Sequence, residues 1–303
     1  MATGGSQLAI YGAIGANFCI AVMKFVASYF TGSASMLSEG IHSLIDTGNG
    51  GLLLYGIKRS QQEPDHKHPF GYGKEVFFWS FVVAIFIFAV GGGLAIYEGF
   101  SHIQHPSVFD DSKIMWNYGV LIGGVLVESV SFYLAFREFR RTQPTGFFSA
   151  IRKSKDAATF AVMIEDTAAM LGLVVALVFV FIGHMTGNPV WDGIGSIAIG
   201  VLLCSVSLFL ARETKGLLVG ESANDKTLEQ LNRVLNGHDE VEKIGNLRTM
   251  HLGPAEVLLA VDVDFASNLN SDQVEAAVEQ LEKEIQAAMP HVSQIYIEAH
   301  KLS

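Results

Sequence analysis

Three residues that could do chemistry lie close together in one apolar stretch: Glu39, His42 and Asp46. They are spaced i, i+3 and i+7, so on a helix of about 3.6 residues per turn they share one face. An ionisable group at membrane depth is costly unless it is paired, hydrated or bound to an ion. The spacing therefore predicts half of a metal site, and the alternative is that these groups only pair with one another or with polar neighbours.

A second acidic pair, Glu165 and Asp166, lies in another apolar stretch and is the candidate for the other half. Together with His42 and Asp46, and with Glu39 as a further candidate, it would offer one nitrogen and several carboxylate oxygens. Zinc suits such ligands, and manganese, iron and cobalt stay open as alternatives. Metal binding requires a neutral imidazole and ionised carboxylates, so protons and metal compete. His42 is the expected proton carrier, because imidazole has the unperturbed pKa closest to physiological pH.

Two more ionisable residues interrupt apolar stretches. Glu128 is predicted to be either an added ligand or proton relay, or equally a packed residue bonded to a hydroxyl group of a neighbouring helix. Lys24 is predicted to have a structural role, either snorkelling towards the interface or pairing with a carboxylate.

The elements that must hold these residues are membrane helices. Apolar residues make up 50% of the chain and its mean hydropathy is +0.35, which is typical of a polytopic membrane protein. We expect six transmembrane helices within a domain over residues 1–212, because six stretches are long enough to span a bilayer. They run approximately over Leu8–Phe30, Ser35–Ile57, Val76–Ile96, Tyr118–Phe136, Phe160–Ile182 and Trp191–Leu210.

Charge and cysteine content set further expectations. Lysine and arginine gather in the loops after the second and fourth spans, so by the positive-inside rule both termini are predicted to be cytoplasmic. The net charge of −10 argues against a nucleic-acid partner. Only Cys19 and Cys204 are present, which excludes a disulfide framework. The first residues contain no signal peptide, so a bacterial inner membrane is the expected location.

Residues 213–303 are predicted to form a cytoplasmic α+β domain. Leucines and valines at helical spacing predict a helix after Ser222, an extended segment follows over Val241–Leu252, and Val257–Phe265 alternates as a half-buried strand does. An amphipathic helix over Asn270–Met289 and a strand over Val292–Ala299 complete the order α-β-β-α-β, which suggests a ferredoxin-like fold. A domain of about 80 residues is only marginally stable alone, so we expect dimerisation to help it.

These features together resemble the cation diffusion facilitators, and among them the zinc transporter nine branch. The resemblance rests on motifs in order along nearly the whole chain: His42-x-x-x-Asp46, Pro64–Gly71, Glu165–Ala169, Thr186–Pro189, Trp191–Ser196 and Leu247–Pro254. It implies a homodimer that exchanges zinc or a related divalent ion for protons, with His42, Asp46 and Asp166 as ligands. The family usually has a histidine four residues before this aspartate, where the present chain has Val162.

The resemblance also implies secondary metal sites. One would lie in the loop at Asp65 and His68, where Tyr72 replaces a further histidine of some members, and the alternative is a solvated loop with a structural turn. The other would lie in the C-terminal domain, where His251 could converge with Glu298 and His300, two residues that point to one side of the last strand.

The predicted function is thus export of a divalent metal, most simply zinc, from the cytoplasm by proton-coupled antiport with alternating access. The alternative is a membrane sensor or scaffold that binds metal without transporting it, motivated by Val162. An enzyme is not expected, because the sequence contains no His-Glu-x-x-His motif and no activated nucleophile near the acidic residues.

Overall fold

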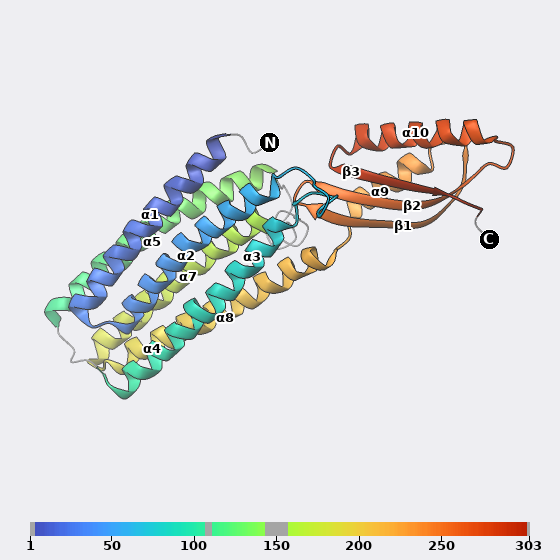
Figure 1. The fold of residues 1–303 in the computed structure, drawn as a ribbon. Helices are drawn as coiled ribbons and strands as arrows, with labels where there is room; N and C mark the ends of the chain where they lie inside the picture. Colours follow the sequence, from blue (N-terminus) through green and yellow to red (C-terminus); the bar gives the residue numbers. More distant parts are fainter. Residues whose placement is uncertain (1–3, 107–110, 143–156, 302–303) are drawn as a thin grey trace. The chain divides into compact units, whose positions relative to one another are not determined.

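A computed structural model describes residues 4–106, 111–142 and 157–301 (Figure 1). The chain forms two compact units. The first is built from the segment that ends at Gly56 together with Phe78–Thr214, and the second from Ile57–Phe77 together with the segment that begins at Lys215. The predicted basic segment between the fourth and fifth spans lies largely outside the described residues.

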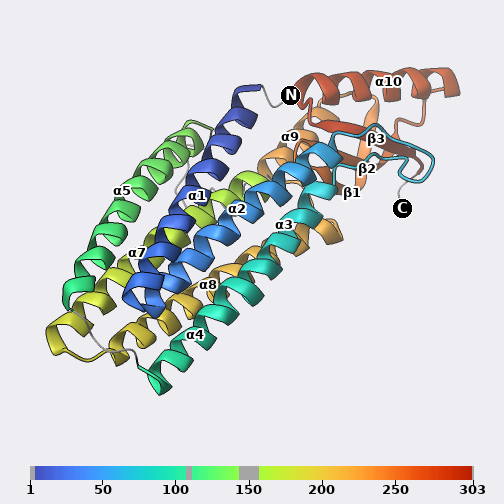
Figure 2. The same cartoon turned by 60° about the vertical axis from the view of Figure 1, so that its left-hand side comes forward.

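The first unit is a bundle of long helices that run side by side (Figures 1 and 2). In chain order they are α1 (Gly4–Thr31), α2 (Ala34–Ser60), α3 (Glu75–Phe86), α4 (Gly93–Gln104), α5 (Asp111–Thr142), α7 (Ala157–Thr186) and α8 (Val190–Val219). A π-helical segment, η1 (Ile87–Gly92), joins α3 to α4 without a break, so these three elements form one continuous helix. The helices pack around an apolar core that includes Leu121, Leu173, Ile199 and Leu203.

Three of the described helical segments are long and apolar enough to cross a membrane: Glu75–Gln104, Ala161–Thr186 and Val190–Val219. Shorter apolar segments lie in α1 and α5, over Asn17–Thr31 and Asn117–Val130. These findings support a helical, multi-pass membrane protein. α2 does not reach the same apolarity because it carries buried Glu39, His42 and Asp46, so the count of six spans stays a prediction.

Glycine pairs hold α4 and α8 in close contact. A Cβ atom on Gly99 would lie 2.5 Å from the carbonyl oxygen of Gly193, and one on Gly193 would lie 2.8 Å from that of Gly99. Gly92 and Gly200 repeat this arrangement seven residues away, at 3.0 and 2.8 Å. Small residues at such spacing allow helix backbones to approach in a membrane. These contacts therefore hold α8, the helix that carries Asp192, against the continuous helix formed by α3, η1 and α4.

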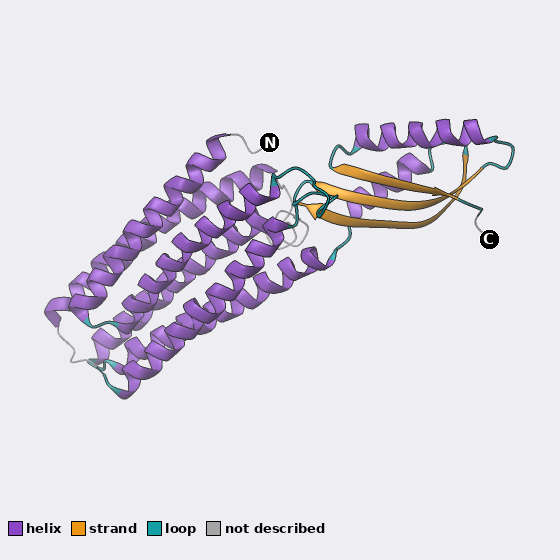
Figure 3. Ribbon diagram, viewed as in Figure 1, coloured by secondary structure: helices purple, strands orange, loops and turns teal. Residues whose placement is uncertain are grey.

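The second unit contains helices packed on a three-stranded sheet (Figure 3). Its elements are α9 (Asp225–Leu235), β1 (Val241–Gly253), β2 (Glu256–Phe265), α10 (Ser271–Ala288) and β3 (Val292–Ala299). The central strand β2 pairs antiparallel with β1 and parallel with β3. This confirms the predicted order of elements, including the alternation of buried residues along β2. The assignment to a ferredoxin-like fold stays a prediction.

Candidate functional site

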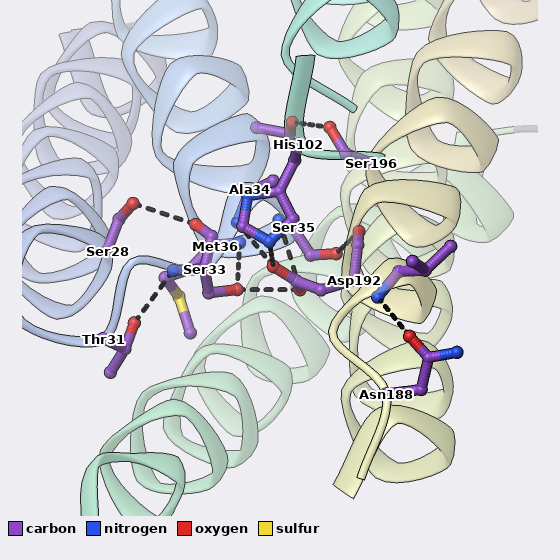
Figure 4. Close-up of polar contacts among 12 residues, drawn as sticks. Ser28, Thr31, Ser33, Ala34, Ser35, Met36, His102, Asn188, Asp192 and Ser196 are labelled. Atoms are coloured by element: carbon purple, nitrogen blue, oxygen red, sulfur yellow. Dashed lines mark hydrogen bonds and ion pairs between the residues drawn. The ribbon is translucent and has the colours of Figure 1, made fainter. Parts of the chain in front are cut away.

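The helix that carries His42 and Asp46 is held at its N-terminus by an aspartate from another helix (Figure 4). The carboxylate of Asp192 on α8 accepts hydrogen bonds from Ser33 Oγ at 2.8 Å, Ala34 N at 2.5 Å and Ser35 N at 3.4 Å. His102 Nε2 on α4 lies 3.8 Å from the same carboxylate. The free N–H groups of a helix N-terminus favour an anion there. Asp192 therefore caps α2 from outside and positions it in the bundle.

Further along α2, His42 and Asp46 face each other inside the bundle. His42 Nδ1 lies 3.5 Å from Asp46 Oδ1, and the two residues are only 1% and 7% exposed. Within the described part of the chain, neither ring nitrogen of His42 nor Oδ1 of Asp46 has a hydrogen-bond partner. Two donors of a tetrahedral zinc shell are separated by about 3.4 Å, from bond lengths near 2.05 Å. The pair is thus already spaced as two metal ligands would be.

Glu165 on α7 reaches this pair. Its carboxyl group interacts electrostatically with that of Asp46, and its Oε1 accepts a hydrogen bond from Asn49 Nδ2 at 2.6 Å. Two neighbouring buried carboxyl groups repel each other when both are ionised, unless one is protonated or a cation lies between them. The contact between α2 and α7 therefore brings together two groups that can hold either protons or a cation.

Asp166, the residue at the family's ligand position, is placed differently. No hydrogen bond or ion pair of the described residues joins it to His42 or Asp46; its charged neighbours are Glu165 and Glu128. Glu128 on α5 is 4% exposed. Val162 is 39% exposed in the single chain. Of the two adjacent acids, it is therefore Glu165 that the structure brings to Asp46.

Glu39 is engaged elsewhere. Its Oε2 lies 3.0 Å from Nζ of Lys24 on α1, and the same ammonium group donates to Ser43 Oγ at 2.8 Å. Both charged side chains are completely buried. The prediction that Lys24 pairs with a carboxylate is confirmed, and the alternative that it snorkels to an interface is wrong, because helices α1 and α2 enclose it.

Across the described ranges, no group of three or more histidine, cysteine, aspartate or glutamate side chains lies close enough together to hold a metal ion. His42, Asp46 and Glu165 are neighbours but do not form a closed ligand shell in this structure. A complete one would require side chains to move, and the ligand list therefore stays a prediction.

The loop residues Asp65 and His68 form a compact turn. Asp65 accepts hydrogen bonds from the backbone N–H groups of Lys67 and His68 at 2.9 and 2.7 Å, and from the Tyr72 hydroxyl at 2.7 Å. The Tyr72 hydroxyl and these backbone donors hold the pKa of Asp65 below its usual range. Tyr72 thus stabilises the ionised carboxylate of Asp65. Tyr72 itself stands at the position where some members of the cation diffusion facilitator family have a histidine.

The C-terminal candidates do not converge within one chain. His251 on β1 pairs with Val257 of β2, which pairs with Val292 of β3. Glu298 lies six residues beyond Val292 on β3. At about 3.3 Å per residue the separation along the sheet is roughly 20 Å. The strand register therefore keeps His251 apart from Glu298 and from His300, which follows the strand.

Two residues of this region were not singled out from the sequence. Asn49 follows Asp46 by three positions, so its helical spacing was an available signal. Asp192 was noted only within a motif, and its role as a cap for α2 depends on a contact between residues far apart in the chain.

Comparisons with known proteins identify both parts of the chain. Residues 10–219 match the cation efflux transmembrane domain, and residues 223–300 match the cytoplasmic domain of cation efflux proteins. Over 245 residues the chain is 36% identical to the proton-coupled zinc antiporter SLC30A9, mitochondrial, of Mus musculus and to that of Homo sapiens. These matches cover 80% of this chain and 43% of each relative.

A plant relative matches over more of its length. The metal tolerance protein C4 of Arabidopsis thaliana is 29% identical over 339 residues, which cover 97% of this chain and 74% of that protein. The chain spans less than half the length of the animal relatives.

The two domain matches together cover nearly all of the present chain and confirm the resemblance inferred from its motifs. The chain belongs to the cation efflux family of transporters.

Proposed function

We propose that this protein is a proton-coupled antiporter of a divalent metal, with zinc as the favoured substrate and manganese, iron and cobalt as alternatives. The proposed ligands are His42 and Asp46 on α2 with Glu165 and Asp166 on α7. The observation that carries the proposal is the buried His42 ring, whose nitrogens lack hydrogen-bond partners among the described residues while Nδ1 lies 3.5 Å from Asp46. Such a ring is costly unless a cation or proton satisfies it.

The charge balance of the bundle supports exchange. Asp46, Glu128, Glu165 and Asp166 are neighbours in the interior, whereas the buried ammonium group of Lys24 is engaged by Glu39. Buried carboxylates are stable only when they are protonated, paired or bound to metal. A divalent ion that enters must therefore displace protons, and protons that return release it. We leave Glu39 out of the ligand set because it pairs with Lys24.

The remaining architecture is part of the same proposal. Six spans, cytoplasmic termini, a ferredoxin-like C-terminal domain and a homodimer fit the helices, the sheet and the family. Alternating access would move α2 and α7, which carry the site, relative to their neighbours. The location in a bacterial inner membrane stays a prediction, and the animal relatives are named mitochondrial. Metal binding at Asp65 and His68 also stays a prediction, whereas the strand register does not allow His251 to share a site with Glu298 and His300 within one chain.

The test is metal uptake into proteoliposomes with an imposed pH gradient, with zinc, manganese, iron and cobalt supplied in turn. We expect gradient-dependent zinc uptake that is lost in Asp46→Ala and in Glu165→Gln. Glu229→Gln, which changes an exposed carboxylate on α9, serves as the matched control and should transport normally. Zinc that binds to the protein but does not cross the membrane would contradict antiport. That result would favour the sensor or scaffold suggested by Val162.

A further inference from the structure

The buried pair of Lys24 and Glu39 lies on the same path as the proposed metal site. Along one face of α2 the order is Asp46, His42 and Glu39, and the helix begins at Ala34. Glu39 is about one helical turn from His42, on the side away from Asp46. The pair therefore stands between the proposed site and the end of the bundle where Asp192 caps α2.

Four helices enclose this pair without leaving room around it. Lys24 comes from α1 and Glu39 from α2. A Cβ atom on Gly172 of α7 would lie 2.5 Å from Glu39 Oε1, and one on Gly124 of α5 would lie 3.8 Å from Lys24 Cε. Both charged side chains have no exposed surface. Gly172 thus lets α7 approach Glu39 directly, and α5 lies at van der Waals distance from Lys24 at Gly124.

A second carboxyl group is within reach of the ammonium group. Glu128 on α5 interacts electrostatically with both Lys24 and Glu39. Oε2 of Glu39 faces Lys24, while its Oε1 has no hydrogen-bond partner among the residues that the structure describes. Lys24 consequently has two acidic neighbours, Glu39 on α2 and Glu128 on α5.

We propose that the Lys24–Glu39 pair is a gate between the metal site and the end of the bundle where α2 begins. This inference rests on the proposed function. While the pair is intact, its ammonium group repels an approaching divalent cation and its side chains fill the space between the four helices. When the gate opens, the ammonium group of Lys24 moves from Glu39 towards Glu128, which removes the positive charge from the path. The carboxylate of Glu39 can then contact the metal ion as it passes from the site to the end of the bundle.

The test replaces both charges at once, so that no unpaired charge is left buried. Lys24→Met with Glu39→Gln keeps the size of both side chains, and Lys226→Met with Glu229→Gln on the exposed face of α9 is the matched control. In proteoliposomes, the gate variant should bind zinc as the unsubstituted protein does. Its zinc flux in the absence of a pH gradient should rise several-fold relative to its gradient-driven flux. An unchanged ratio, or a loss of zinc binding, would overturn the gate.

A second measurement needs no metal. Ser38 precedes Glu39, is 1% exposed and forms a hydrogen bond with Ser196. In a Cys19→Ala, Cys204→Ala background, Ser38→Cys should react with a charged thiol reagent several-fold faster when the pair is replaced. Equal rates would overturn the gate. Faster labelling together with no zinc flux in the unsubstituted protein would support the closed path and would contradict only the proposed transport.

Discussion

Asn49 Nδ2 donates a 2.6 Å hydrogen bond to Oε1 of Glu165 and so links α2 to α7 one helical turn beyond Asp46. The two residues are 1% and 8% exposed. An amide donor orients a carboxylate without adding charge to the site. The bond therefore fixes one carboxyl oxygen of Glu165, and the same carboxyl group interacts with Asp46.

Replacement of Asn49 by leucine should weaken zinc binding. The change keeps the approximate size of the side chain but removes the donor, and a hydrogen bond to a charged group contributes about 1.5–3 kcal/mol. We expect the zinc dissociation constant to rise about tenfold, or ~1.4 kcal/mol, in calorimetry on the detergent-solubilised protein. Thr47→Val is the control, because the Thr47 hydroxyl bonds only to the backbone of its own helix. Equal affinities for the two variants would contradict a positioning role.

Loss of the Glu165 carboxyl group should weaken zinc binding, and a histidine introduced at position 162 should not restore the affinity. Val162 is 39% exposed, whereas Glu165 interacts with Asp46. Glu165→Gln is therefore expected to weaken zinc binding by tenfold or more, since it removes an ionisable carboxyl group beside Asp46. The double variant Glu165→Gln, Val162→His should regain little of the lost affinity. Recovery of affinity in the double variant would show instead that this chain uses the family's ligand position.

The sequence places His42 and Asp46 on one helix face and offers Glu165 and Asp166 together, but which of these two acids faces Asp46 depends on packing. His42 and Asp46 share a face because of their i, i+4 spacing, which any helix produces. Glu165 and Asp166 are adjacent, so about 100° of helix rotation separates them and only one can face α2 directly. In the structure it is Glu165 that interacts with Asn49 and Asp46 of α2. The rotation of α7 about its own axis decides this, and no local sequence pattern predicts that rotation.

The same distinction applies to the fold. The strands and helices of the C-terminal unit follow from alternating and helical periodicity, and their order was predicted correctly. For Lys24 the sequence predicted a carboxylate partner but not its identity, because the pairing with Glu39 crosses from α1 to α2. The seven-residue spacing of Gly92 and Gly99 and of Gly193 and Gly200 is visible in the sequence, but which helix each pair contacts depends on tertiary packing.

Gly99→Ala should destabilise the bundle. The added Cβ would lie 2.5 Å from the carbonyl oxygen of Gly193, a backbone atom that can move only if α4 and α8 separate. Overpacking of this kind costs about 1–3 kcal/mol in the free energy of unfolding. Gly119→Ala on α5 meets nothing within 4 Å and should be neutral or slightly stabilising. Thermal unfolding in detergent would compare the two, and equal midpoints would argue against close helix contact.

Tyr72→Phe should raise the pKa of Asp65. The Tyr72 hydroxyl is the main cause of the low pKa of this carboxyl group, ahead of the His68 backbone N–H. Because the folded-state pKa is depressed, ionised Asp65 stabilises the turn above its unfolded pKa of about 3.9, and this contribution is lost as the pH falls through the folded pKa. The variant should therefore lose the turn at a higher pH. An NMR titration of the Asp65 carboxyl carbon would measure this, with Tyr296→Phe on β3 as control.

Asp192→Ala should loosen the start of α2. The substitution removes the acceptors for Ser33, Ala34 and Ser35, and loss of a helix cap with buried donors left unpaired costs about 2 kcal/mol. Asp192→Asn keeps one acceptor oxygen, so its loss of thermal stability should be smaller. His42 lies about 12 Å along the helix from Ala34, so the zinc dissociation constant should stay close to normal in both variants. A large loss of zinc affinity with little change in stability would mean that Asp192 acts on the metal site itself and not through the position of α2.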